Sequence, residues 1–299
     1  MNLSPASILL DLASFRSQAL GSLIGSGADG KSDALWQTVF KGVTSDSASA
    51  SPLSIVSKGG EVSDVKGLSS SGRNLGLFDP ESAYKMMSVI NNNDVSFKAQ
   101  FSELSQMKSY VSQMHDAGQH LGSISESSSD ESVAAQLQEF VGQYNGWVQR
   151  FNPDMEQGGA MADAQAAQIS RYELDQSIKN PFNGARDGVH GLADLGISID
   201  PNTKLASLDT GRLNSLLANN RKGAIDTVQE FSANFAKSAE LLNSAGNFIP
   251  NRLNNLDKVI DYFAEHKRDL QQEFGTGDVA KPSGTIAQAL AAYQQTYGV

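Results

Sequence analysis

The sequence predicts a mainly α protein, an elongated antiparallel helical bundle or coiled coil that carries a small β-hairpin. Apolar residues recur at intervals of mostly three and four through residues 96–275, which is the spacing of a helix stripe or a coiled-coil seam. Hydrophobic residues make up 39% of the chain and aromatic residues 7%. Elongated helical proteins fold with such modest contents because each helix buries only one stripe. Within residues 197–208, apolar and polar residues alternate on both sides of a turn, which predicts the hairpin.

The first 79 residues divide into two segments of different composition. Residues 1–40 are predicted to be an amphipathic helical segment, with Ser4 and Pro5 typical of a helix N-cap and first turn. The apolar stripe of this segment consists of Ile8, Leu9, Leu12, Phe15, Leu20 and Leu23. Residues 41–79 are rich in Ser and Gly and are predicted to be a mobile linker. This linker is either a plain spacer or an exposed, protease-sensitive arm.

A helical bundle domain is predicted over residues 80–275. A short helix is expected to open at Pro80 and to end near residue 90, before a longer helix that ends near residue 121. The next helix follows a polar, Ser-rich segment at 123–130, so the two helices should form an antiparallel hairpin. The stripes of these two helices are Phe97, Phe101, Leu104, Met107, Val111, Met114 and Leu121, and Val133, Leu137, Phe140, Tyr144, Trp147 and Phe151. Pro153 should stop the second of them.

The second half of the domain is organised by turns and caps. A further helix is expected over about 160–179, and the β-hairpin follows near 197–208. Asp209 is expected to cap the next helix. Two helical seams then follow as far as residue 275, with a break near Gly246. Residues 276–299 are predicted to be a separate C-terminal tail segment, rich in Ala.

Charge and residue types argue against several classes of function. The formal net charge is −10 and the pI is near 4.9, so phosphate backbones would repel this surface and we expect no nucleic acid partner. The chain contains no cysteine, which removes disulfides and thiolate ligands. Its four histidines are isolated, and His115 and His120 lie on different faces of one predicted helix. We therefore expect no enzyme activity, no catalytic residues, no metal site and no cofactor.

The sequence also bears on localisation. No window approaches 18 continuous apolar residues, so no membrane insertion is expected. The N-terminal stretch lacks a basic region followed by a continuous apolar run, so no Sec signal peptide is expected. A chain of this kind either stays in the cytoplasm or is exported by a route without a cleaved signal.

Two stretches carry a resemblance to a known family. Residues 192–231 combine a Leu-Gly-Ile sequence, the short hairpin and the Asp-capped helix, and FVGQYN at 140–145 contains a Tyr-Asn pair. In this combination the chain resembles the C-terminal region of the flagellar hook-associated protein 2 family, the filament-capping proteins, as a divergent and minimal relative. The family-like motif residues are Leu195, Gly196, Ile197, Leu208, Asp209, Leu213, Tyr144 and Asn145. The resemblance covers roughly residues 130–275.

The resemblance implies a structural protein of an extracellular flagellar or flagellum-like assembly. Such a protein would leave the cell through the flagellar type III route. Its partners would be further copies of itself in a homo-oligomer, flagellin or other axial proteins, and an export chaperone. The alternative is a soluble, non-enzymatic helical adaptor or chaperone-like binding module in the cytoplasm.

Assembly is expected to use the two ends of the chain. Segments 5–24 and 285–297 are both amphipathic, and we expect each to become ordered only on binding. The predicted assembly residues are Leu9, Leu12, Phe15, Ile286, Leu290 and Tyr293.

Overall fold

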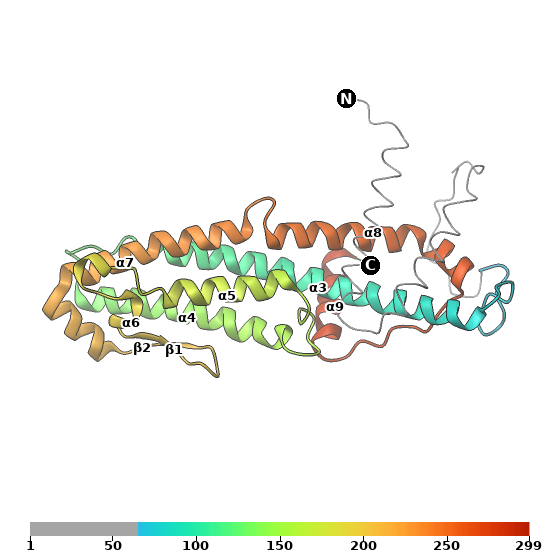
Figure 1. Cartoon of the computed structure of the whole chain (residues 1–299), viewed down its shortest axis with the longest axis horizontal. Helices are drawn as coiled ribbons and strands as arrows, with labels where there is room; N and C mark the ends of the chain where they lie inside the picture. Colours follow the sequence, from blue (N-terminus) through green and yellow to red (C-terminus); the bar gives the residue numbers. More distant parts are fainter. Residues whose placement is uncertain (1–64, 299) are drawn as a thin grey trace, which may run out of the picture. The chain divides into compact units, whose positions relative to one another are not determined.

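The computed structural model describes residues 65–298, which lie within one compact unit, Glu61–Val299. The predicted N-terminal segment 1–40, with Leu9, Leu12 and Phe15, lies outside the described residues. The mainly α fold with a small β-hairpin is confirmed (Figure 1). In chain order the elements are α3 (Pro80–Leu121), α4 (Asp130–Met155), α5 (Gln165–Lys179), the 3-10 turn η2 (Ala185–Asp187), α6 (Gly191–Asp194), β1 (Ile197–Ile199), β2 (Ala206–Leu208), α7 (Thr210–Asn243), α8 (Phe248–Phe274) and α9 (Gly284–Tyr297).

Helix α3 is the common neighbour of the other long helices. Its C-terminal half packs beside α4 and α7, and its N-terminal half packs beside α8 and α9 (Figure 1). α3 and α4 run antiparallel, as the polar loop between them predicts. None of the helices in residues 65–298 contains an apolar stretch long enough to cross a membrane.

Helix α3 differs from the prediction, because it is one continuous helix of 42 residues rather than two. The NNND sequence at 91–94 favours a local break, yet the helix passes through it. The Asn91 side chain donates to the carbonyl oxygens of Thr276 and Asp278, at 3.0 and 2.9 Å, and Lys98 pairs with Asp94 at 2.8 Å. Asn91 thus bonds to the far end of the chain, and Asp94 bonds one turn along the same helix, so neither side chain interrupts it.

Aromatic side chains fill the core between α3, α4 and α7. Phe140 meets the rings of Phe231 and Phe235 edge-on, with ring centroids 5.2 and 5.0 Å apart. Gly118 allows α7 to come this close, because a Cβ at that position would lie 2.6 Å from the Phe235 ring. The apolar stripes of the sequence therefore serve first as an intramolecular core.

The helix caps are largely those that the sequence predicts. Ser129 and Asp209 each accept a hydrogen bond from a backbone N–H of the helix that follows, α4 and α7 respectively. Pro153 does not stop α4 at once, because the helix continues to Met155. A proline this close to the C-terminus of a helix disturbs only the last turn.

Two segments are more closely attached than predicted. Residues 65–79, the described part of the predicted linker, form turns that bond to α3 and to the end of α8. Residues 284–297 form α9, which packs against α3 with Ala289 and Tyr293 buried. The expectation that the C-terminal segment becomes ordered only on binding was wrong for this helix.

Candidate assembly surface

The family-like motif residues meet at one junction, where the hairpin joins α4, α6 and α7. β1 and β2 pair in antiparallel register, with Ile197 opposite Leu208. Gly196 has φ +90°, and a Cβ there would lie 2.5 Å from the carbonyl oxygen of Asp209, so only glycine fits. The Asp209 N–H donates to the Gly196 carbonyl at 2.9 Å. The apolar motif residues that this junction buries are Leu195, Ile197, Leu213 and Tyr144.

Asn145 attaches the hairpin to α4. Its amide nitrogen donates to the Ala206 carbonyl at 2.9 Å, and its amide oxygen accepts from the Ala206 N–H at 2.7 Å. One side chain thus satisfies both backbone groups at the edge of β2. The motif is therefore a structural joint, and its buried residues are not themselves an exposed binding surface.

Replacing Asn145 with Ala should lower the free energy of unfolding by about 2–3 kcal/mol, because the nearly buried Ala206 N–H and carbonyl would lose both partners. Urea unfolding followed by circular dichroism measures the change. The matched control is Asn219→Ala, which removes an exposed side chain that bonds only within α7. An equal loss in the two variants would contradict the role of Asn145.

The predicted C-terminal assembly residues lie on α9. Tyr293 is buried, and its ring lies edge-on to Phe101 with centroids 6.0 Å apart. Ile286 is half-buried and packs on a cluster of alanines from α3, from the turn after α4 and from α9 itself. Leu290 is half-buried as well. Ile286 and Tyr293 thus pack against the protein's own α3, and the predicted role of the three residues between copies stays a prediction.

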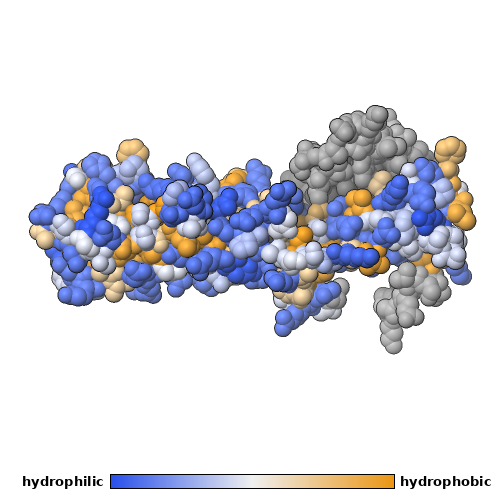
Figure 2. All heavy atoms as spheres, turned by 90° about the horizontal axis from the view of Figure 1, so that it is seen from below, coloured by the Kyte–Doolittle hydropathy of each residue, from blue (hydrophilic) through white to orange (hydrophobic). Residues whose placement is uncertain are grey.

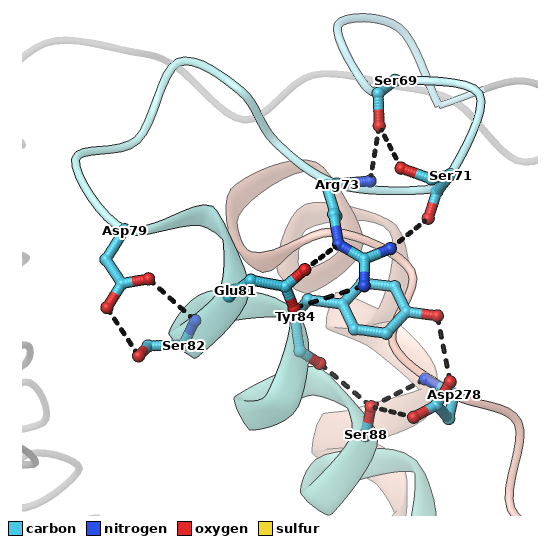
Figure 3. Close-up of polar contacts among 9 residues, drawn as sticks. All are labelled: Ser69, Ser71, Arg73, Asp79, Glu81, Ser82, Tyr84, Ser88 and Asp278. Carbon is cyan, nitrogen blue, oxygen red and sulfur yellow. Dashed lines mark hydrogen bonds and ion pairs between the residues drawn. The ribbon is translucent and has the colours of Figure 1, made fainter.

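A polar clasp joins the start of α3 to the segment that follows α8 (Figure 3). The Arg73 guanidinium donates to Glu81 at 2.5 Å and lies 4.2 Å from the centroid of the Tyr84 ring. The Tyr84 hydroxyl donates to Asp278 at 3.1 Å, and the Asp278 N–H donates to Ser88 at 2.7 Å. Burial and the bond to Asp278 raise the pKa of Tyr84.

Backbone contacts reinforce the clasp. The Thr276 N–H donates to the Gly72 carbonyl at 2.8 Å, and the Asn74 amide donates to the last carbonyls of α8, those of Gln272 and Glu273. Residues that are about 200 positions apart in the sequence are thereby fixed beside each other.

Large apolar side chains stay exposed around this clasp. The exposed fractions are 106% for Phe78, 78% for Val279 and 67% for Leu75. Figure 2 shows apolar residues on the surface where α3 begins, and further apolar residues along the helices toward the other end. A contiguous group of exposed apolar side chains is typical of surfaces that bind other proteins, so these three residues are candidates for such a surface.

A row of polar side chains runs along the middle of α3. Gln100, Glu103 and Gln106 follow one another at single-turn spacing, and two arginines approach them from neighbouring helices. Arg150 of α4 donates to Glu103 and Gln106, both at 2.7 Å. Arg252 of α8 donates to Gln100 at 2.7 Å, and its burial lowers its pKa.

Two buried carboxyl groups share Arg150. The guanidinium also donates to Asp154 at 3.0 Å, and the side chains of Glu103 and Asp154 are each 5% exposed. Burial, together with the neighbouring Asp154 charge, raises the pKa of Glu103 to about 7, although Arg150 opposes the shift. These long-range contacts fix α4 against α3 in one register.

Sequence reasoning missed both the clasp and the polar row. The signal for the row was present, because Glu103 and Arg150 stand directly beside stripe residues where a solvated residue is not expected. Within the described residues, no three His, Asp or Glu side chains are grouped so that they could hold a metal ion. His115 and His190 each contact one neighbouring aspartate on their own segment.

Comparison with known proteins gives no relative: no family model, no curated protein and no solved structure matches the chain.

Proposed function

We propose that this chain is a structural protein similar to the hook-associated protein 2 family, and that it assembles by helix packing into a flagellar or flagellum-like structure outside the cell. Its partners are copies of itself, flagellin or other axial proteins, and an export chaperone. The type III flagellar route carries it out of the cell.

The observation that carries this proposal is the exposed apolar end of the molecule. Leu75 and Phe78 lie in the sequence between the clasp residues Arg73 and Glu81, and Val279 follows the clasp residue Asp278. Each apolar side chain of this size loses about 1.5–3 kcal/mol by remaining in water, so a partner that covers all three gains a substantial free energy.

The motif residues give a second line of support. Gly196, Asp209 and Asn145 each have a specific conformational role at the hairpin joint. The residues that carry the family resemblance thus act together as one unit, as a shared architectural joint would.

Shearing the surface appendages from cells that express the chain tests this function. The expected result is that an antibody detects the protein in the sheared fraction and that deleting the gene shortens or removes the appendages. Detection in the cytoplasmic fraction alone, with unchanged appendages, would contradict the proposal and would favour the adaptor.

A further inference from the structure

Helix α9 is attached to the bundle differently from the other long helices. α4 and α8 are tied to α3 by Arg150 and Arg252, and α7 is tied to it by Asn243. Within residues 65–298, the side chains of α9 make no described hydrogen bond or ion pair to another helix. Its attachment rests on apolar contacts, chiefly those of Ala289 and Tyr293.

The start of α9 is weakly held as well. Ser283 stands at the N-cap but makes no side-chain capping bond, and the buried Thr285 hydroxyl has no partner among the described residues. An unpaired buried hydroxyl and an unused cap each cost on the order of 1 kcal/mol. Release of this helix therefore breaks no polar contact with its neighbours.

Residues 279–283 connect the clasp to α9. The clasp ends at Asp278, and Val279 directly after it is 78% exposed. Neither helix nor strand forms in this connection, and Gly284 at its end has φ +58°. A short, open connection between a fixed anchor and a separately packed helix is the arrangement that permits exchange of the helix between copies.

We propose that α9 is exchanged between copies of this chain, so that in the assembly the α9 of one copy packs on the α3 of a second copy. The site is the one that α9 occupies here, lined by Phe101 and Ala99. Tyr293 and Tyr297 both lie against Phe101, with ring centroids 6.0 and 5.6 Å away, so three aromatic rings define how the incoming helix sits.

An exchanged α9 makes the same contacts with the α3 of the second copy as it makes with its own α3. The free-energy cost of exchange within the assembly is therefore small. The connection of five residues spans at most about 18 Å when fully extended. The two copies must therefore lie with the N-terminal halves of their α3 helices side by side. Val89 is exposed within this half of α3 and Phe78 is exposed just before the helix begins, and exchange would bring both side chains close to the neighbouring copy. The exchange deepens the proposed function and rests on its assumption that copies assemble.

Engineered thiols test the exchange, because the natural chain has no cysteine. Phe101→Cys is placed in one chain and Tyr297→Cys in another, and the two are mixed at a concentration at which light scattering detects oligomers. A short bismaleimide then links thiols that lie close together. A double variant with both changes in one chain, diluted until it is monomeric, shows that the two positions can be linked.

The matched control mixes chains that carry Ser198→Cys and Ser207→Cys. These hydroxyls lie 3.3 Å apart across the hairpin and are exposed, so linkage between separate chains measures chance collision. The expected result is a linked dimer from the Phe101→Cys and Tyr297→Cys mixture, with a joined peptide containing positions 101 and 297, at least tenfold above the control.

Two other results are possible, and they have different consequences for the two proposals. Oligomers without this linkage would overturn the exchange and leave the proposed assembly standing. A chain that forms no oligomers at any concentration and gives no linkage between chains would overturn both.

Discussion

Replacing Arg150 with Met is expected to lower the free energy of unfolding by about 3–5 kcal/mol at pH 8. The guanidinium is the cation that both Glu103 and Asp154 contact, and each of those side chains is 5% exposed. Removing it leaves two carboxyl groups buried without their cation, which is one of the costliest single changes available in a folded chain. Urea unfolding at pH 8 measures the loss.

The control for Arg150 removes a cation from the surface. Lys237 pairs with Glu240 on α7, and both side chains are about 60% exposed. Lys237→Met should change stability by less than about 1 kcal/mol. Similar losses in the two variants would show that the buried cluster does not depend on Arg150. At pH 5 the loss in Arg150→Met should shrink, because Glu103 is then protonated and neutral.

Glu103→Gln is expected to stabilise the protein at high pH and to flatten its pH dependence. The pKa of Glu103 is raised from an ordinary value of 4.5 to about 7 in the folded protein, so the folded state holds this proton more tightly than the unfolded chain. Stability from this group is therefore fully present below pH 4.5 and is lost as pH rises through 7. Between these two pKa values the loss of stability is about 3 kcal/mol, because a tenfold change in proton affinity corresponds to about 1.36 kcal/mol.

The glutamine variant cannot lose that proton, and it keeps an oxygen that accepts from Arg150. It should match the natural chain at pH 4.5 and exceed its free energy of unfolding at pH 8 by up to about 3 kcal/mol. Glu139→Gln on the exposed face of α4 is the control and should leave the pH profile unchanged. A parallel profile for Glu103→Gln and the natural chain would refute the account of this carboxyl group.

The polar row around Arg150 separates two groups of helices that pack against α3. On one side of it, α3 packs with α4 and α7 around fully buried aromatic rings such as Phe140. On the other side, α3 packs with α8 and α9, and exposed residues such as Phe78 lie at its end. The surface proposed for assembly thus lies in the half where α3 packs with α8 and α9.

Local signals in the sequence predicted the local structure. The alternation within residues 197–208 and the aspartate at 209 predicted the hairpin and the cap of α7, because turn and capping preferences act over a few residues. The interior stripes were predictable for the same reason, since helix periodicity identifies the buried face of each helix.

Long-range pairing accounts for what the sequence did not reveal. The break expected near Asn91 is absent because that side chain bonds to residues 276 and 278, which no local pattern connects to it. The C-terminal segment was expected to become ordered only on binding, yet its Tyr293 packs against the Phe101 ring of α3, about 190 residues earlier in the sequence, which no local pattern reveals. The exposed apolar side chains at the start of α3 could not be predicted either. Whether a side chain stays exposed depends on the whole arrangement of helices.

Light scattering at several concentrations, on the full chain and on a chain lacking residues 1–24, tests the assembly claim most directly. The full chain should form a ring-sized or concentration-dependent oligomer. The shortened chain should stay monomeric with the circular dichroism of a folded helical bundle, because the described helices begin at residue 80. A full chain that is monomeric at every concentration, or a shortened chain that assembles like the full one, would contradict the account.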